Sequence, residues 1–254
     1  MSTRISDLPR QASNCNSCRL SSLCFPENLS SCAVDAVSEL IRQRRPLSRG
    51  EPLYTAGAPF RAIYAVRSGA IKTSTVLANG DEHVCGFHLP GEILALDALA
   101  SGTHVSTAVA LETSSVCEIP YQALERLGAE LPSIHQRLLV IMSREVYLER
   151  GLSQTLARRS AEQRLAVMLL SLSERFAERG QSSTRFRLPM SRYELANYLG
   201  LTPETMSRVF RRLHQQSLVA ADGKEIEIKD LEKLSFLADG NSISTQRTAN
   251  SRRH

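Results

Sequence analysis

The stretch between Pro132 and Ser160 is the feature of this sequence that most limits the possible folds. After its first residue it contains no proline and only one glycine, Gly151, so nothing in it ends a helix early. A helix of about 27 residues would be about 40 Å long, which is longer than one small domain needs for its own core. A helix of this kind often pairs with a copy of itself, and the sequence therefore predicts a homodimer.

One side of the predicted helix is suited to such a pairing. Leu139, Met142 and Val146 follow one another at spacings of three and four residues, and Glu149 continues the same stripe. In a symmetric pair Glu149 would face its own copy, and two like charges there would weaken the dimer. We predict that these four residues form a marginal dimer interface, which can therefore be switched.

The region before this helix, residues 46–120, is predicted to be β-structure. Short runs with β-branched and aromatic residues, such as 62–66, 70–76 and 114–119, are separated by glycine-containing turn signals. Strands at this spacing, with no long helical stretch between them, are typical of a β-roll or jelly roll.

The clearest local signals in the chain mark two short helices near its C-terminal end. Ser191 can cap a helix over residues 192–199, and Gly200 can end it. Thr202 can cap the next helix, with Pro203 in the favoured first position. A helix, a short glycine-containing turn and a second helix are the pattern of a helix-turn-helix.

The second of these helices offers side chains that suit contacts with DNA. Its exposed side carries Glu204, Ser207, Arg208, Arg211 and Arg212. Arg208 can grip a guanine with two hydrogen bonds, Glu204 can accept from a cytosine amino group, and Ser207 can reach a base edge. Arg211 and Arg212 come later in the helix and would meet phosphates.

The distribution of charge and a predicted hairpin support the same reading. Through Glu149 the chain has 13 Lys and Arg against 15 Asp and Glu, but from Arg150 onward it has 18 against 11. A basic C-terminal part attached to a mildly acidic body indicates a polyanionic partner. A hairpin with an Asp222-Gly223 turn follows the two helices and predicts a winged helix-turn-helix. An ordinary helical hairpin with a basic, solvated face is the alternative.

Three of the six cysteines, Cys15, Cys18 and Cys24, lie within ten residues near the N-terminus. This spacing on one irregular loop allows three sulfurs to converge on a metal centre, which needs a fourth ligand. The candidates for that ligand are Cys32, Cys85, Cys117 or a histidine. An iron–sulfur cluster, a structural zinc ion and redox-active or inert thiols all remain possible, although the usual paired zinc spacing is absent.

Several stretches resemble the fumarate and nitrate reduction (FNR-type) regulators of the cyclic-AMP receptor protein (CRP/FNR) superfamily. The resemblance extends from about Cys15 to Leu237. The stretches that carry it are Cys15-x2-Cys18-x5-Cys24, Tyr64-Ala65-Val66-Arg67-Ser68-Gly69, Gly86-Phe87-His88-Leu89, residues 110–120, Asn197-Tyr198-Leu199-Gly200-Leu201-Thr202 and Glu204-Thr205-Met206-Ser207-Arg208.

The resemblance implies a sensing mechanism. It implies a [4Fe–4S] cluster held by four cysteines, Cys15, Cys18, Cys24 and Cys117. Cys32 and Cys85 would then not be ligands. Without oxygen the cluster is intact and the protein is a dimer that binds DNA; oxygen degrades the cluster, loosens the dimer and lowers the affinity for DNA.

The resemblance also implies partners and their contact residues. Glu204, Ser207 and Arg208 match the family's base-reading residues, so the expected target is double-stranded DNA with palindromic TTGAT-type half-sites. Glu149 matches an acidic residue on the family's dimer stripe. Gly80 and Asp81 lie in a loop that matches a surface touching RNA polymerase.

Two departures from the superfamily pattern limit what can be carried over. Cyclic-nucleotide binders hold the phosphate with an Arg-Ser pair, and the matching positions here are Thr107 and Ala108. With no guanidinium there, no cyclic nucleotide is expected to bind. Arg19, which follows Cys18, is bulky and charged and would change solvent access to a cluster.

Two other classes of protein compete with the oxygen-sensing regulator. An iron–sulfur enzyme would need a substrate pocket with acid–base residues, and the sequence shows neither a nucleophile–base motif nor a phosphate-binding glycine loop. His88 is more often structural than catalytic in such a strand. A family relative without the cluster, gated by zinc or by thiols, is the second alternative.

We therefore predict an α+β chain with an N-terminal β-roll (jelly-roll) sensor domain, a long dimerisation helix and a C-terminal winged helix-turn-helix. The expected segments are a cysteine-rich segment (1–30), the β-roll (31–131), the dimerisation helix (132–160), the DNA-binding domain (161–238) and a disordered tail (239–254). No apolar run approaches the ~20 residues that span a bilayer, and Met1 to Gln11 lacks a secretory pattern, so a cytoplasmic location and no membrane partner are expected.

Overall fold

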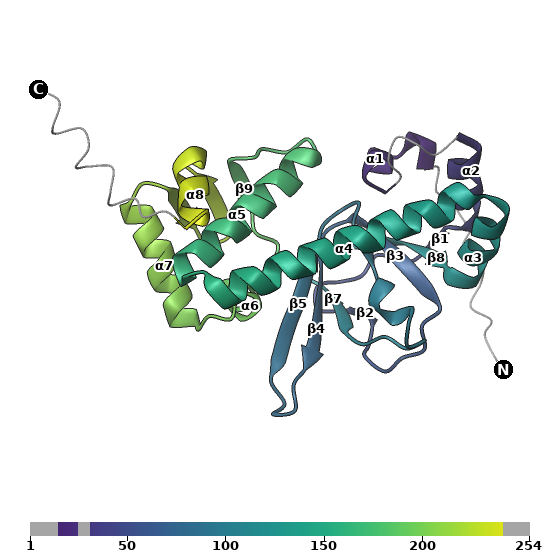
Figure 1. Ribbon diagram of the computed structural model, residues 1–254, viewed down its shortest axis with the longest axis horizontal. Helices are drawn as coiled ribbons and strands as arrows, with labels where there is room; N and C mark the ends of the chain where they lie inside the picture. The colour runs from purple at the N-terminus through teal and green to yellow at the C-terminus, as the bar shows by residue number, and fades with distance from the viewer. Residues whose placement is uncertain (1–14, 25–30, 241–254) are drawn as a thin grey trace, which may run out of the picture. The chain divides into compact units, whose positions relative to one another are not determined.

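The computed structural model describes residues 15–24 and 31–240 (Figure 1). Contacts divide the chain into two compact units. The first comprises the residues up to Thr75 together with Phe87–Ser143, and the second comprises Val76–Gly86 together with the residues from Arg144 onward. The rest of the predicted cysteine-rich segment (residues 1–14 and 25–30) and residues 241–254 of the predicted tail lie outside the described residues.

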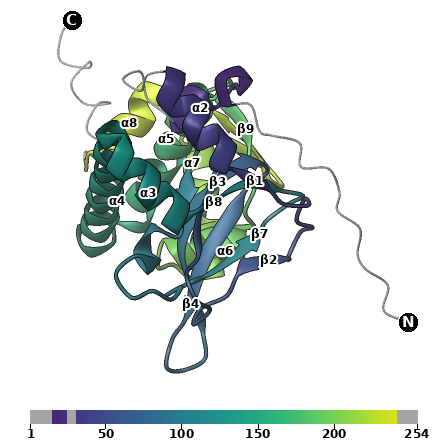
Figure 2. The same ribbon diagram turned by 90° about the vertical axis from the view of Figure 1, so that its right-hand side faces the viewer.

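Eight strands form two four-stranded sheets, with the strand orders β1-β8-β3-β6 and β2-β7-β4-β5. Their bounds are β1 Arg42–Gln43, β2 Pro52–Tyr54, β3 Ala62–Ser68, β4 Ile71–Val76, β5 Glu82–His88, β6 Ile93–Leu94, β7 Thr107–Ala110 and β8 Ser115–Pro120. The strands β3 and β8 run antiparallel and side by side in both views (Figures 1 and 2). The β-roll expected from the sequence is confirmed.

Alternation along β3 explains why nearly the whole strand is buried. Tyr64 and Val66 face a core that also includes Ile71 and Ala108, whereas Ile63 faces a second core with Val37 of a covering helix. Successive side chains of a strand point to opposite faces, so a strand covered on both faces is apolar at every position.

Short helices surround the sheets of the first unit. They are η1 Cys15–Ser17, α1 Ser21–Cys24, α2 Ser31–Leu40, η2 Leu96–Ala98 and α3 Tyr121–Glu130. Val37 of α2 and Leu124 of α3 are buried in the second core together with Ile119 of β8. The odd-numbered side chains of β8 therefore face these helices.

The predicted long helix is present as α4, which runs without interruption over Pro132–Arg158 (Figure 1). Ile134 and Thr155 are buried, whereas Leu139 and Val146 remain 65% and 52% exposed. Within the described part of the chain, no helix combines the length and apolarity needed to cross a bilayer.

The second unit contains the predicted helix-turn-helix and its wing. Its helices are α5 Ala161–Glu178, α6 Arg192–Tyr198, α7 Pro203–Gln215 and α8 Leu231–Ala238, and its strands are β9 Arg185–Arg187, β10 Val219–Asp222 and β11 Glu225–Ile228. The strands form one sheet in the order β10-β11-β9. The largest fully buried side chains of this unit are Leu165, Leu169, Leu172, Leu188, Met190, Leu195, Leu199, Met206 and Leu213. The C-terminal winged helix-turn-helix is confirmed.

The turn of the wing differs from the prediction by one residue. Asp222 pairs with Glu225, so the two central residues of the turn are Gly223 and Lys224 rather than Asp222 and Gly223. Gly223 has φ +54°. A glycine at the first central position is what a type II′ hairpin turn prefers, and it takes precedence over the Asp-Gly signal of a type I′ turn.

Candidate thiol site and DNA interface

The cysteine-bearing segment, residues 15–24, consists of two tight turns. The N–H of Cys18 donates to the carbonyl of Cys15 at 3.1 Å, and the N–H of Cys24 donates to the carbonyl of Leu20 at 3.0 Å. These turns fold the segment back on itself, so the thiols of Cys15, Cys18 and Cys24 come from one short piece of chain.

A few contacts hold this segment to the rest of the first unit. The N–H of Cys15 donates to the hydroxyl of Ser38 in α2 at 3.2 Å. The thiol of Cys24 lies 3.7 Å from the carbonyl oxygen of Gly91. The guanidinium of Arg137 in α4 donates to the carbonyls of Leu23 and Cys24, each at 3.4 Å.

Of the four cysteines implied by the resemblance, Cys24 interacts electrostatically with the other three. The pKa of the Cys24 thiol is raised to about 12, chiefly by burial and in addition by the neighbouring thiols of Cys18, Cys117 and Cys15, whereas Arg137 acts to lower it. Burial also raises the pKa of the Cys15 thiol. Cys117 and Ile119 are two residues apart in β8, so their side chains lie on the same face of the sheet, which is the face that the helices cover.

Cysteine thiolates are the donors that hold iron–sulfur clusters in proteins. Among residues 15–24 and 31–240, no three His, Cys, Asp or Glu side chains lie close enough together to hold one metal ion. A cluster binds each thiolate to a different iron, so its ligands are spaced more widely than those of a single ion. The thiol of Cys24 interacts electrostatically with those of Cys18, Cys117 and Cys15, which are the other three cysteines implied by the resemblance.

The helix-turn-helix is fixed by caps at the start of both helices. The hydroxyl of Ser191 accepts from the N–H of Glu194 at 3.2 Å, and the Glu194 carboxylate accepts from the N–H of Ser191 at 2.8 Å. The hydroxyl of Thr202 accepts from the N–H of Thr205 at 3.2 Å. Both N-caps predicted from the sequence are therefore present.

The two sides of α7 differ sharply. Its buried side consists of Met206, Val209, Phe210 and Leu213. All five predicted DNA contacts are exposed on the other side: Glu204, Ser207, Arg208, Arg211 and Arg212. Hydrogen bonds from its own backbone N–H and from the Thr202 hydroxyl hold the pKa of the Glu204 carboxyl below its usual range, so this side chain is an ionised acceptor at neutral pH.

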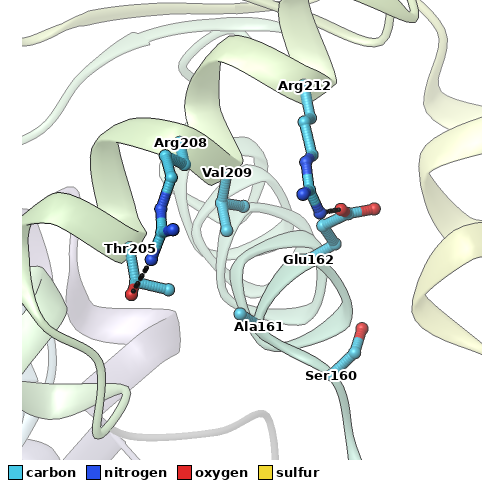
Figure 3. Close-up of a pocket in the computed structure, with 7 residues that line it drawn as sticks. All are labelled: Ser160, Ala161, Glu162, Thr205, Arg208, Val209 and Arg212. Carbon is cyan, nitrogen blue, oxygen red and sulfur yellow. Dashed lines mark hydrogen bonds and ion pairs between the residues drawn. The ribbon is translucent and has the colours of Figure 1, made fainter.

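Intramolecular contacts already orient several of these side chains. The hydroxyl of Ser207 donates to the Pro203 carbonyl at 3.0 Å, and Arg208 donates to the Thr205 hydroxyl at 3.1 Å. Arg212 forms an ion pair of 2.7 Å with Glu162 at the start of α5. Figure 3 shows both arginines beside a shallow pocket of about 240 Å³, whose other lining residues are Ser160, Ala161, Glu162, Thr205 and Val209.

The wing is tied to α6 by Arg192. Its guanidinium lies 4.3 Å from the centre of the Phe210 ring and donates to the Gly223 carbonyl at 3.2 Å. Lys224 donates to the Pro189 carbonyl at 2.6 Å. The hairpin turn and the helices thus form one surface with fixed internal geometry.

The remaining predicted residues lie on exposed surfaces. On α4 the stripe of Leu139, Met142, Val146 and Glu149 is exposed along its whole length. Gly80 and Asp81 form the exposed tip of the loop between β4 and β5, where the Asn79 side chain accepts from the Asp81 N–H at 3.1 Å.

Sequence reasoning missed two residues that position the helix-turn-helix. Asn197 in α6 accepts from the Val84 N–H at 2.7 Å and donates to the Glu82 carbonyl at 2.7 Å, both within the second unit. Arg164 in α5 donates to the carbonyls of Leu156 and Leu199, at 2.6 and 3.1 Å. Asn197 belongs to a stretch that carries the resemblance, but no pattern in the sequence indicates its distant partners.

The chain matches two known domain families. Residues 44–130 match the cyclic nucleotide-binding domain, and residues 163–237 match the Crp-like helix-turn-helix domain. The transcriptional activator protein FnrA of Stutzerimonas stutzeri is 43% identical over 240 residues, which cover 94% of this chain and 98% of FnrA. The transcriptional activator protein Anr of Pseudomonas protegens is 44% identical over 227 residues, which cover 89% and 93% of the two chains.

A solved structure supports the same relationship. FixK2 from Bradyrhizobium japonicum superimposes with a TM-score of 0.71 at 28% identity, over 78% of this chain and 96% of that one. The similarity therefore extends over most of this chain and nearly all of FixK2.

Proposed function

Because the chain belongs to the FNR-type transcription regulators of the CRP/FNR family, we propose that it switches transcription in response to oxygen. Like its relatives it is a DNA-binding regulator and not an enzyme, which removes the iron–sulfur enzyme as an alternative. In the proposed mechanism a cluster-loaded homodimer binds palindromic DNA, and loss of the cluster releases the DNA.

The observation that supports the sensing proposal is that Cys117 of β8 acts electrostatically on the thiol of Cys24, which is far from it in the sequence. Cys18, Cys117 and Cys15 all act on the thiol of Cys24, although Cys117 comes from the middle of a strand. We assign these four residues as the ligands of a [4Fe–4S] cluster. When bound, the cluster supplies an oxygen-labile group, and the four thiols hold it as thiolates after releasing their protons.

We expect no cyclic nucleotide as the signal, although residues 44–130 match a cyclic nucleotide-binding domain. Ala108 in β7 pairs with Tyr54 of β2 and Thr73 of β4 and is fully buried, and the Thr107 hydroxyl accepts from the Ala56 N–H at 3.0 Å. Neither residue offers the positive charge that a cyclic phosphate requires.

The exposed stripe of α4 supports a dimer formed with a second copy of the chain. Leu139, Met142 and Val146 are apolar and exposed, and burying them against an identical helix would be favourable. Glu149 at the end of the stripe would meet its own copy, and this repulsion keeps the dimer sensitive to small changes elsewhere.

A two-fold dimer presents two copies of α7 to successive major grooves. We propose that Glu204, Ser207 and Arg208 read the bases of TTGAT-type half-sites, and that Arg211 and Arg212 bind phosphates. Gly80 and Asp81 are proposed to contact RNA polymerase. A cytoplasmic location is proposed with them, since all these partners are found there.

The first test is anaerobic purification followed by absorption spectroscopy and counts of iron and sulfide, repeated after exposure to air. We expect about four irons per chain and a broad visible band that bleaches in air. Zinc or no metal, together with DNA binding that is indifferent to air, would instead support a zinc- or thiol-gated regulator.

Replacing one ligand tests the assignment residue by residue. Cys117→Ser is expected to abolish cluster assembly and anaerobic DNA binding while circular dichroism shows an intact fold. Cys32→Ser, at an exposed position of α2, is the matched control and should behave as the unmodified protein. A full iron content in Cys117→Ser would show that another residue is the fourth ligand.

A further inference from the structure

The side chain of Arg137 joins the cysteine-bearing segment to α4. The Nη2 of Arg137 donates to the Leu23 carbonyl and its Nε donates to the Cys24 carbonyl, each at 3.4 Å. Leu23 and Cys24 end α1, and carbonyls at a helix end have no partner within their own helix. One planar guanidinium can serve both carbonyls at once, because its donors are held in a fixed fork.

The opposite side of the segment rests on a glycine turn of the β-roll. A Cβ atom added at Gly91 would lie 2.8 Å from the Leu23 Cβ, so only glycine allows this approach. The turn is itself anchored, because the Gly91 N–H donates to the Val66 carbonyl at 2.7 Å. The end of the segment is therefore held between a fixed turn and the guanidinium of Arg137.

Arg137 and the predicted dimer stripe lie on different sides of the same helix turn. Two residues correspond to about 200° around a helix, so Leu139 points away from the side that carries Arg137. Arg137 is partly buried, whereas Leu139 is exposed. A change in what Arg137 binds thus acts on the turn that presents Leu139 and Met142.

We propose that Arg137 is a positioning residue that couples the state of the cysteine-bearing segment to the dimer stripe of α4. This inference rests on the proposed function. While the four cysteines hold their cluster, the carbonyls of Leu23 and Cys24 are held at the guanidinium and fix this turn of α4. When the segment is released, Arg137 loses both acceptors, and the turn that carries Leu139 is no longer held in the pairing position.

The coupling has a measurable size. If the ordered segment favours the arrangement of α4 that pairs, it raises the affinity of the dimer. The gain in the free energy of dimerisation cannot exceed the difference between the segment's interaction free energies with the two arrangements of α4. Allosteric couplings of this kind change affinity by roughly 5- to 150-fold. We expect the dimer dissociation constants of the metal-free and iron-loaded proteins to differ by a factor in this range.

The test uses the full-length protein, reconstituted with iron and sulfide without oxygen, and compares it with its air-exposed form. Iron content and the dimer dissociation constant from sedimentation are measured for both forms. Arg137→Ala is expected to keep about four irons per chain while the ratio of the two dissociation constants falls toward one. Arg137→Lys retains the charge without the fork and should give an intermediate ratio.

Arg144→Ala is the matched control. It removes an arginine two turns further along the same side of α4, where the side chain pairs with Glu178 at 3.8 Å. For Arg144→Ala, the ratio of the dimer dissociation constants of the iron-loaded and air-exposed forms should equal that of the unmodified protein. If Arg137→Ala loads iron and keeps the full ratio, the coupling through Arg137 is wrong although the proposed function stands.

Other outcomes are equally decisive. Unmodified protein that takes up no iron, or whose two dissociation constants are equal, overturns the proposed function and the coupling with it. If Arg137→Ala fails to hold iron, the Arg137→Lys variant tests the coupling instead. If Arg137→Lys retains iron and the full ratio of the two dimer dissociation constants, the coupling is wrong. If it retains iron with a reduced ratio, the coupling is supported.

Discussion

The helix-turn-helix and the thiol site are assembled in opposite ways. Helices α6 and α7 are capped by Ser191 and Thr202, which directly precede them in the chain. The proposed thiol site takes its cysteines from the segment 15–24 and from Cys117 in β8. The caps of the first come from adjacent residues, although Asn197 in α6 also binds the backbone of Glu82 and Val84, whereas the second requires distant parts of the first unit to come together.

The contacts that hold the two regions differ in strength as well. Leu195 and Leu213 in the helix-turn-helix are fully buried, and the capping hydrogen bonds are 2.8 to 3.2 Å long. The cysteine-bearing segment is held by contacts of 3.2 to 3.7 Å. The helix-turn-helix is therefore built on a fully buried core, whereas Leu23 of the cysteine-bearing segment is only partly buried.

The largest expected effect, on the free energy of unfolding, comes from opening a cavity in the core of the helix-turn-helix. Leu213→Ala should lower the free energy of unfolding by about 2–5 kcal/mol, because a fully buried leucine is replaced by a void. Leu23→Ala in the cysteine-bearing segment, where the side chain is only partly buried, is the comparison and should cost less. Denaturant unfolding of both variants measures the difference, and equal losses would contradict the contrast in packing.

A smaller effect, on DNA binding, is expected from a substitution on the exposed side of α7. Arg208→Ala should weaken binding by about 1–3 kcal/mol at one guanine position and leave thermal stability unchanged, since the side chain is exposed. Titrations against operators substituted at single positions measure this. A uniform loss over unrelated sequences, as expected for Arg211→Ala, would make Arg208 a phosphate contact instead.

The smallest effect tests a cap. Thr202→Ala should cost about 1 kcal/mol of stability, because the Thr205 N–H at the start of α7 loses its acceptor. Ser207→Ala, five residues later on the exposed side of the same helix, is the control and should change stability by less. Thermal unfolding of the two variants would reveal whether the cap contributes as the contrast requires.

The same difference explains what could be predicted from sequence. Caps, turns and apolar spacing act over a few residues, so Ser191, Thr202 and the long helix over Pro132–Arg158 could be found from their neighbours. The turn at Gly223 was misplaced by one residue, because two glycine turn types compete for the same signal.

Contacts over long distances leave no such pattern. Cys117 could be named only through resemblance, since nothing near it in the sequence distinguishes it from Cys32 or Cys85. Arg137 and Asn197 act through backbone groups of their partners, and backbone groups are the same at every residue. Their roles become visible only when the fold brings the partners together.

The two hydrogen bonds between the Asn197 side chain and the backbone of Glu82 and Val84 have a consequence for synthesis of the protein. The two backbone groups, the Val84 N–H and the Glu82 carbonyl, are separated from Asn197 by 113 and 115 residues. At about 5–20 residues per second, a ribosome needs roughly 6 to 23 seconds to supply that stretch. During this time the Val84 N–H and the Glu82 carbonyl, which follow the Asn79–Asp81 loop, bind water instead of the Asn197 side chain. A nascent chain that stalls before α6 therefore carries this loop in an unfinished form, and only a completed chain presents it as the mature regulator does.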